Sequence, residues 1–283
     1  MTKHATGGTG DPEQSPQQAT MHKATFRFHD NINFFLPQKQ RDAIIEHSFD
    51  WRASIKDMVE SLGPPHSEIG LLVVDGLSVD FSYIVEPGVH IDVHSRFDAV
   101  DLANKIALRP PLTGCPRFVL DTHLGRLANY LRMMGFDTLY RNDYPDEELA
   151  QVSSDEQRIL LTRDVGLLKR SLVVYGYYVR ATNPRRQIVE VMTRYALADK
   201  AQPFHRCIKC NDVLHPVAKE DIIDQLPKTS AEYFEEYSQC QGCGKLYWKG
   251  SHYERMQGII EEVIASVNGA KDSADSPKRD QSA

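Results

Sequence analysis

The chain has 283 residues, a formal net charge of −6 at pH 7 and 41% hydrophobic residues. This length accommodates two or three domains with separate cores, and the negative charge excludes a uniformly basic nucleic-acid binder. No apolar run approaches the roughly 18 residues of a membrane span, and no apolar segment of the signal-peptide type follows the first residues. We therefore expect a cytoplasmic protein without a membrane-spanning segment.

The N-terminal part of the chain has the element order of a β-grasp fold. Alternating apolar side chains predict a β-hairpin over residues 23–36, and apolar residues at helical spacing predict a helix over 55–62. Short strands are predicted at 71–74, 79–85 and 89–93. This order is similar to the ubiquitin-like and sulfur-carrier group. Because sulfur carriers act through a free C-terminal Gly-Gly, and this chain continues beyond the last strand, we expect a packing module or a docking module for a protein partner.

Strands and helices alternate in the middle of the chain, after a Pro- and Gly-containing linker. Four short strands are predicted, at 118–120, 138–140, 159–161 and 177–179. Such alternation predicts a parallel sheet covered by helices on both faces. The predicted organisation is a disordered tail (1–20), a β-grasp domain (21–106), a linker (107–116), an α/β domain (117–200), a cysteine-containing module (201–260), and a helical end with a polar tail disordered from about 269 (261–283).

Four of the five cysteines form two CxxC pairs, Cys207 with Cys210 and Cys240 with Cys243. A two-residue gap lets both sulfurs of a pair point at one ion, and tetrahedral Zn²⁺ takes four such ligands. We therefore predict a structural zinc ribbon. The alternatives are a thiol-redox or sulfur-transfer pair, or thiols that only fill a core. With Cys115 the only cysteine left over, this usage is typical of a reducing compartment.

Aspartates follow three successive strands of the predicted parallel sheet: Asp121 after the first, Asp143 and Asp146 after the second, and Asp164 after the third. Ligands bind beyond the carboxyl ends of parallel strands, and carboxylates brought together there repel one another unless a cation neutralises them. Hard oxygen ligands select Mg²⁺ or Mn²⁺, which support phosphodiester hydrolysis by water. The alternative is that each Asp only caps the helix that follows it.

Several segments together resemble the mut-seven C-terminal RNase family: Phe118–Tyr140, Ile159–Asp164, Arg206–Asn211 and Cys240–Tyr253. The resemblance covers about residues 117–257. It implies a PIN-like nuclease domain with a C-terminal zinc ribbon, and a preceding ubiquitin-like domain is a known arrangement in the family. It also implies a metal-dependent ribonuclease whose acidic residues correspond to Asp121, Asp146 and Asp164, with Asp143 as a fourth candidate.

The sequence departs from the family pattern at two places. Thr122 and His123 follow Asp121 where the family usually has a small residue and Met, and the fourth strand ends in Thr182-Asn183 instead of an Asp. The missing fourth acid leaves open an alternative function, a non-catalytic RNA-binding or adaptor protein on a degenerate PIN-like scaffold.

Arginines beside the predicted acidic site are candidates for contact with RNA, because Arg binds phosphate in bidentate fashion. They are Arg126, Arg163, Arg185 and Arg186, and the alternative for each is a solvated surface group. Residues 117–200 hold 13 Lys and Arg against 11 Asp and Glu, whereas residues 21–106 hold 8 against 13. We therefore expect single-stranded or structured RNA to contact the middle of the chain.

Overall fold

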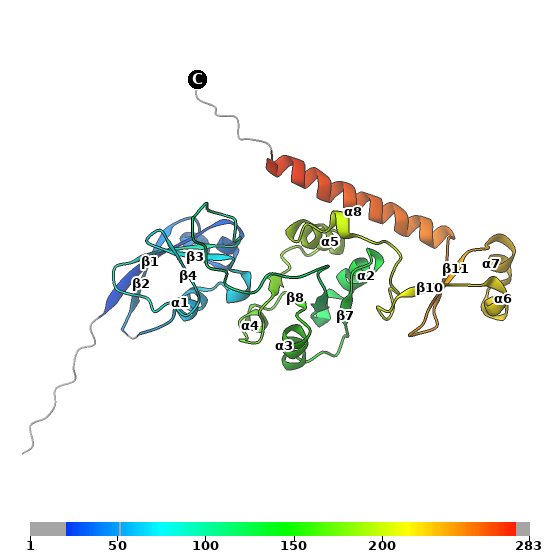
Figure 1. The fold of residues 1–283 in the computed structure, drawn as a ribbon, viewed down its shortest axis with the longest axis horizontal. Helices are drawn as coiled ribbons and strands as arrows, with labels where there is room; N and C mark the ends of the chain where they lie inside the picture. The colour runs from blue at the N-terminus through cyan, green and yellow to red at the C-terminus, as the bar shows by residue number, and fades with distance from the viewer. Residues whose placement is uncertain (1–20, 51, 276–283) are drawn as a thin grey trace, which may run out of the picture.

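The computed structural model describes residues 21–50 and 52–275. Three β-sheets follow one another along the long axis of an elongated molecule (Figure 1). The tail predicted for residues 1–20 lies outside the described residues, and so does the part of the C-terminal tail, predicted from about residue 269, that begins at 276. Within the described ranges, no helix combines the length and the apolar character that a membrane span needs.

The first sheet has five strands in the order β2-β1-β5-β3-β4, with β1 and β5 parallel and the other neighbours antiparallel. Its elements are β1 (His22–Phe28), β2 (Ile44–Phe49), β3 (Leu71–Val74), β4 (Leu77–Val79), β5 (His90–His94) and helix α1 (Ile55–Leu62). Alternate residues of β1, among them Phe26 and Phe28, enter a core shared with α1. Helix α1 has the predicted bounds, and Gly63 ends it in a backbone conformation (φ 135°) that favours glycine.

The predicted hairpin over 23–36 is wrong in its second strand. β1 pairs with β2 instead, and Asp30–Phe35 form a short 3-10 helix, η1. The side-chain amide of Asn33 donates to the carbonyl of Phe28 (2.9 Å) and to the carboxylate of Asp42 (2.8 Å), which closes this segment locally. The strand predicted at 79–85 is also wrong beyond Val79, where the Asp80 side chain accepts the N–H of Ser82 (2.8 Å) in a turn.

The second sheet has four parallel strands in the order β7-β6-β8-β9. The strands are β6 (Phe118–Leu120), β7 (Thr138–Tyr140), β8 (Ile159–Thr162) and β9 (Gly176–Tyr178), and the helices are α2 (Gly125–Met133), α3 (Asp146–Asp155), α4 (Val165–Leu168) and α5 (Pro184–Arg194). Phe118 and Leu120 face α2 and α5, whereas Val119 faces α3 and α4. The strand order reverses between β6 and β8, which is where parallel sheets place their ligands.

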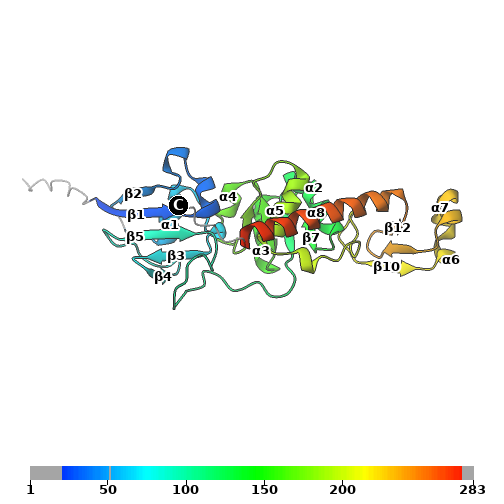
Figure 2. The same cartoon turned by 90° about the horizontal axis from the view of Figure 1, so that it is seen from above.

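The third sheet is the small antiparallel sheet β10-β11-β12 near the cysteines. Its strands are β10 (Leu214–Val217), β11 (Tyr237–Cys240) and β12 (Leu246–Trp248), and two short helices, α6 (Lys219–Ile222) and α7 (Lys228–Tyr233), lie between the first two. Helix α8 (Ser251–Asp275) then runs back along α5 (Figures 1 and 2), and Ile260 and Val263 enter the core of the parallel sheet. The segment predicted as disordered from residue 269 is therefore helical as far as Asp275. The predicted fold class, a β-grasp followed by a parallel α/β sheet and a cysteine ribbon, is confirmed.

The N-terminal module is docked on β9 through a short 3-10 helix, η3 (His66–Glu68). Glu68, which is 2% exposed, accepts the backbone N–H of Tyr178 (2.5 Å) and forms an ion pair with Arg180 (3.0 Å). Arg109, in the predicted linker, donates to the carbonyls of His66, Ser67 and Ile69 on one side and to that of Val174 on the other. These bonds fix the first module against the edge of the parallel sheet.

Candidate active site and metal centre

Asp121 is a buried carboxylate at the carboxyl end of β6. It is 8% exposed and stands at the start of a 3-10 turn, η4 (Thr122–Leu124), but its side chain makes no capping hydrogen bond. The hydroxyl of Thr162 donates to Oδ2 at 2.8 Å, and that of Thr122 donates to Oδ1 at 3.1 Å. Among the described residues, no Lys, Arg or His pairs with it. The capping alternative therefore fails for Asp121, and a buried carboxylate without a cationic partner suits a metal ligand.

Asp164, in contrast, caps a helix. Its Oδ1 accepts the N–H groups of Gly166 (2.6 Å) and Leu167 (3.2 Å) at the start of α4. Its own N–H donates to the hydroxyl oxygen of Thr162 (2.9 Å), the same hydroxyl that donates to Asp121. Thr162 thus connects the ends of β6 and β8. Of the two carboxylates, Asp164 caps a helix and Asp121 does not.

The remaining candidate carboxylates lie after β7. The side chain of Asp143 is 77% exposed and pairs with Arg141 at 3.1 Å, while Asp146 opens α3 and lies 4.0 Å from Arg170. Within the part of the chain that the structure describes, no three carboxylates have oxygen atoms within 4.8 Å of one another. The structure therefore places the four aspartates along one edge of the sheet but does not gather them into one cluster.

A cleft of about 480 Å³ opens at the same edge, between the beginnings of α2 and α5. Its polar lining includes His123, Arg126, Asn129, Thr182 and Gln187, and none of its lining residues is acidic. The first residues of both helices also line it, so two helix N-termini, which carry partial positive charge, meet there. An anion such as a phosphate fits this lining better than a cation does.

Gly125 and Tyr140 both line the cleft and lie in close contact with each other. The Tyr140 hydroxyl donates to the carbonyl of Thr122 (2.9 Å), and a Cβ at position 125 would lie 2.6 Å from that hydroxyl oxygen. A larger residue at position 125 would push Tyr140 away from η4. Glycine therefore allows the end of β7 to support the turn that follows Asp121.

The four candidate arginines have different surroundings. Arg126 lines the cleft, and Arg186 is exposed in the first turn of α5. Arg185 pairs with Glu262 of α8 at 2.6 Å. One nitrogen of Arg163 donates to three successive carbonyls, those of residues 179 to 181, at 2.8 to 3.0 Å. Arg163 therefore stabilises the conformation of the segment that follows β9. Of the four arginines, Arg126 is the best placed for contact with a ligand in the cleft.

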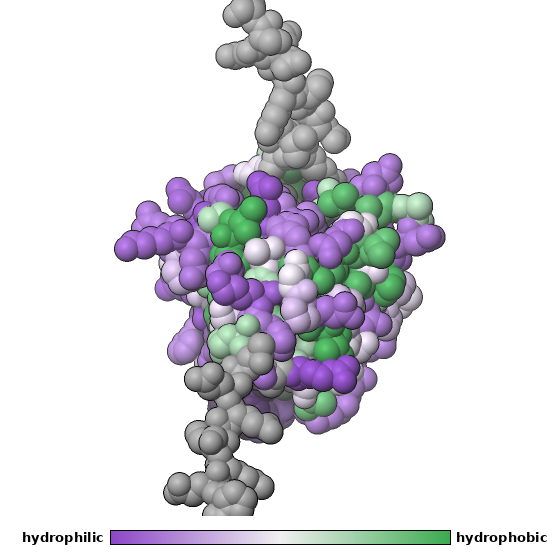
Figure 3. Space-filling view, turned by 90° about the vertical axis from the view of Figure 1, so that its left-hand side faces the viewer, coloured by the Kyte–Doolittle hydropathy of each residue, from purple (hydrophilic) through white to green (hydrophobic). Residues whose placement is uncertain are grey.

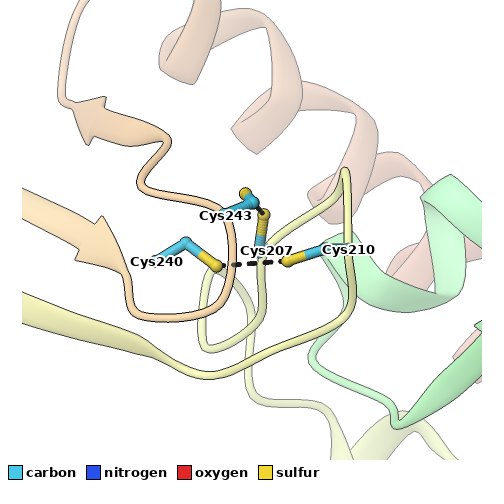
Figure 4. A group of neighbouring side chains, drawn as sticks. All are labelled: Cys207, Cys210, Cys240 and Cys243. Carbon is cyan, nitrogen blue, oxygen red and sulfur yellow. Dashed lines mark hydrogen bonds between the residues drawn. The ribbon is translucent and has the colours of Figure 1, made fainter.

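The four cysteine sulfurs converge from two loops (Figure 4). The sulfurs of Cys207, Cys210, Cys240 and Cys243 all lie within 4.8 Å of one another, with 3.2 Å between those of Cys210 and Cys240 and 3.6 Å between those of Cys207 and Cys243. This donor set fits a tetrahedral thiolate site for one metal ion. The structure thus brings together all four predicted thiol ligands.

The Tyr247 hydroxyl contributes to a lowered pKa of the Cys207 thiol. Burial alone raises the pKa of Cys207, but hydrogen bonds from the Tyr247 hydroxyl and from backbone N–H groups outweigh it and lower the pKa to about 6. The Tyr247 oxygen accepts the N–H of Ile208 (3.1 Å), which leaves its hydrogen for the sulfur at 3.2 Å. Burial and the neighbouring thiols raise the pKa of Cys210 to about 12. A divalent cation bound by the four sulfurs would favour the thiolate form against the effects of burial and of the neighbouring thiols.

Several residues of the cleft were missed in the sequence. Asn129 and Gln187 lie inside helices. Thr162, which does not line the cleft but bonds to Asp121, was also missed, because it carries no charge. One signal was available, since Arg126 and Asn129 are three residues apart and share a face of α2. The contribution of α5 has no comparable signal, because it depends on how the helix packs across the sheet.

Family models match both parts of this architecture. Residues 116–260 match the model described as Mut7-C RNAse domain, and residues 21–101 match the model described as Mut7-C ubiquitin. No curated protein and no solved structure matches the chain. The first match includes the parallel sheet, the cleft and the cysteine cluster, and it spans more than half of the 283 residues. The chain therefore belongs to the Mut7-C RNAse domain family and carries a Mut7-C ubiquitin domain in front of its nuclease-type domain.

Proposed function

We propose that the protein is a metal-dependent ribonuclease that hydrolyses RNA phosphodiester bonds, with water as the nucleophile. The family match supports a nuclease-type domain. The observation that carries the finer proposal is Asp121, a buried carboxylate that caps nothing and has no cationic partner in the described residues. It lies at the carboxyl end of an inner strand, two residues before His123 in the wall of the cleft.

Asp121 is the principal ligand in this proposal, with Asp146 and Asp164 as further ligands and Asp143 as a fourth candidate. Mg²⁺ usually keeps several waters and needs only one or two protein carboxylates, so the spread of these side chains is compatible with a shared ion. The bound ion, Mg²⁺ or Mn²⁺, would lower the pKa of a water and neutralise charge on the phosphate. Thr162 and Thr122 hold the Asp121 carboxylate in one orientation.

The cleft beside Asp121 is the proposed RNA site. Arg126, His123 and the two helix N-termini would contact backbone phosphates, and Arg186, Arg185 and Arg163 are more distant candidates. Arg126→Gln is expected to weaken the binding of single-stranded RNA, measured with the Asp121→Asn chain so that no cutting interferes. Unchanged affinity would remove the cleft from the proposal.

Asp121→Asn tests the reaction itself. With labelled single-stranded RNA and Mn²⁺, the wild-type chain should cut, EDTA should stop it, and the variant should lose about 100-fold or more, corresponding to roughly 3 kcal/mol of transition-state stabilisation. Asp155→Asn, an exposed carboxylate at the end of α3, is the matched control and should cut normally. Cutting by Asp121→Asn at the wild-type rate would show that this mechanism is wrong.

A non-catalytic RNA-binding or adaptor protein is the second candidate function. The observations in its favour are that Asp164 caps α4, that β9 is followed by Thr182-Asn183, and that the carboxylates do not form one cluster. RNA binding by the wild-type chain without any cutting in Mn²⁺ would support it.

We further infer that the cysteine cluster holds a structural Zn²⁺. Cys240→Ser should reduce the zinc content from about one ion per chain to none and lower the thermal stability of the ribbon, because metal binding is coupled to the folding of such small modules. Cys115→Ser, an exposed cysteine outside the cluster, is the control. Retained zinc in Cys240→Ser would contradict the assignment. Reduced thiols are also consistent with the proposed cytoplasmic location.

A protein partner for the ubiquitin-like module would have to use the surface that η3 leaves free. The end of the molecule formed by this module shows apolar side chains in separate patches among polar ones (Figure 3). Exposed apolar residues of the module include Ile44 and Leu77. Capture of a partner that Ile44→Ser and Leu77→Ser both abolish would support this role, and capture insensitive to both would oppose it.

A further inference from the structure

A group of histidines lies around one aspartate in the ubiquitin-like module, far along the chain from the nuclease-type site. Strand β5 reads His90-Ile-Asp-Val-His94. Because side chains alternate along a strand, His90, Asp92 and His94 share the outer face while Ile91 and Val93 enter the core. His29 follows β1, the parallel neighbour of β5, and reaches the same group.

The side chains of this group are in direct contact. His29 Nε2 lies 2.7 Å from Asp92 Oδ1, and the rings of His29 and His94 are stacked with centroids 4.2 Å apart. One nitrogen of each ring and one carboxylate oxygen lie within 4.8 Å of one another. His90 lies on the other side of the carboxylate, with Nε2 at 3.6 Å from Asp92 Oδ2 and Nδ1 at 2.9 Å from the hydroxyl of Thr25.

A hydrogen-bonded cluster alone explains only part of this arrangement. Asp92 satisfies one nitrogen of His29, but the stacked ring of His94 offers its neighbour no hydrogen bond, and two protonated rings at this distance would repel each other. Neutral imidazole is the form that binds metal ions.

We propose that His29, Asp92 and His94 form a second metal site, which takes a divalent transition-metal ion such as Zn²⁺ with water completing the shell. Two imidazoles and one carboxylate favour Zn²⁺ and its borderline neighbours over Mg²⁺ or Ca²⁺. Ligand atoms on a tetrahedral Zn²⁺ are roughly 3.3 Å apart, because each bond is about 2.0–2.1 Å long. The side chains therefore have to close by at most about 1.5 Å. His29 and Asp92 are 28% and 29% exposed in their side chains, which gives them room to move and the ion a path to enter.

The site lies at the joint between the two larger modules. The carbonyl of Asn31, two residues after His29, accepts a bond from Arg180 (3.3 Å), and that of Ser95, next to His94, accepts one from Arg194 (3.2 Å). An ion that holds His29 and His94 together would fix both acceptor segments. The second metal site should therefore raise the unfolding temperature of the full chain as well as bind an ion.

The experiment uses the full chain without a histidine tag, carrying Asp121→Asn so that the proposed catalytic carboxylate does not contribute. The chain is first saturated at its cysteines, with one zinc per chain after desalting. Calorimetric titration with Zn²⁺ should then show one further equivalent, with a rise in unfolding temperature. Mg²⁺ should produce neither effect. With Co²⁺ in place of the added Zn²⁺, the spectrum should show nitrogen and oxygen ligation without the charge-transfer band of a thiolate.

Histidine variants test whether His29 and His94 bind the added ion. His94→Ala and His29→Ala should each lose the added equivalent and the rise in unfolding temperature, whereas His22→Ala, at the other end of β1, should keep both. His94 is 7% exposed, so if its variant misfolds, the more exposed His29 carries the test. Absence of the further equivalent in the parent chain, or its retention in His29→Ala, would overturn the proposal. Since Asp121 is already replaced, neither result depends on whether the protein cleaves RNA.

Discussion

Thr162 joins two of the candidate carboxylates although it carries no charge itself. The residue is fully buried at the end of β8, and its hydroxyl donates to Asp121 while it accepts the N–H of Asp164. A hydroxyl has one hydrogen and can both donate and accept, so a single side chain orients the free carboxylate and ties it to the capping loop.

Thr162→Val removes this hydroxyl and keeps the shape of the side chain. We expect the Mn²⁺ concentration for half-maximal RNA cleavage to rise by about 10-fold or more, because partners that orient metal ligands commonly contribute that much. The free energy of unfolding should fall by about 1–2 kcal/mol, since the N–H of Asp164 loses its acceptor. Metal titrations of cleavage, beside Thr193→Val on the exposed side of α5, measure the effect. An unchanged Mn²⁺ requirement would show that Thr162 has no part in metal binding.

Asp121 and Asp164 have the same sequence context, since both follow a buried strand and precede a helix. The sequence could place both at one edge of the sheet, because that depends only on alternating strands and helices. It could not tell that one accepts backbone N–H groups and the other does not. That difference depends on backbone angles over two or three loop residues, and a single sequence does not specify them.

At the scale of elements, Asp137 connects the beginning of β7 to the beginning of β8, two strands away in the sheet, and to the cysteine ribbon. Its carboxylate accepts bonds from Arg158 (2.8 and 3.2 Å) and from the side-chain amide of Asn211 (2.8 Å). Burial alone raises the pKa of Asp137, but these bonds and the positive charges of Arg158 and Arg206 outweigh it and lower the pKa below its usual value. The ionised form is therefore the one that stabilises the fold.

Asp137→Asn should lower the free energy of unfolding by about 2–3 kcal/mol at pH 7, less than for a fully buried pair because the carboxylate is partly exposed. Since the folded-state pKa lies below the unfolded one of about 3.9, this stabilisation is present above that value and is lost as the pH falls through the folded-state pKa. Urea unfolding of the wild type and the variant at pH 7 and near pH 3 should show the difference shrinking in acid. A difference independent of pH would mean that the carboxylate charge does not stabilise the fold.

The elements themselves were predictable to different degrees. The parallel sheet could be predicted because its four short apolar strands alternate with segments whose apolar residues recur at helical spacing. The hairpin was wrong because the apolar residues of η1 imitate a strand, while the turn that they form depends on Asn33 and its distant acceptor Asp42. The true partner, β2, alternates less clearly, with Ile44 exposed.

At the scale of the whole molecule, Glu68 and Arg180 join the ubiquitin-like module to the nuclease-type domain. The guanidinium of Arg180 also lies over the rings of Phe34, Phe35 and Tyr177, at 5.1 to 5.3 Å from their centres. Arg180 belongs to the segment that leaves β9 and leads to Thr182 in the cleft. Docking of the module therefore supports one wall of the proposed RNA site.

Glu68→Gln should weaken this docking by about 3 kcal/mol, because Arg180 keeps its charge in a mostly buried position without an ionised partner. The undocked population would then rise by roughly 100-fold. Limited proteolysis in the linker around Arg109 should accelerate accordingly. Glu46→Gln removes an exposed ion pair with Lys23 and should leave the rate of cleavage in the linker unchanged. Equal proteolysis of both variants would show that the buried pair does not hold the modules together.

This joint could not be predicted from the chain alone. Glu68 and Arg180 are separated by 112 positions, and a charged residue in a loop after a helix is usually solvated. The arrangement of the modules depends on such pairs, whereas each core follows from local patterns of apolar residues.

At each edge of the parallel sheet, one backbone N–H is hydrogen-bonded by a side chain from a neighbouring module. Glu68 of the ubiquitin-like module accepts the N–H of Tyr178 on β9, and Asn211 of the cysteine ribbon accepts the N–H of Thr138 on β7 (2.8 Å). A fragment limited to residues 117–200 would lose both acceptors and present two bare strands to solution. Such edges recruit further strands, so the excised fragment should self-associate by strand addition, while the intact chain stays monodisperse. On this prediction, the flanking modules protect the edges of the sheet against aggregation.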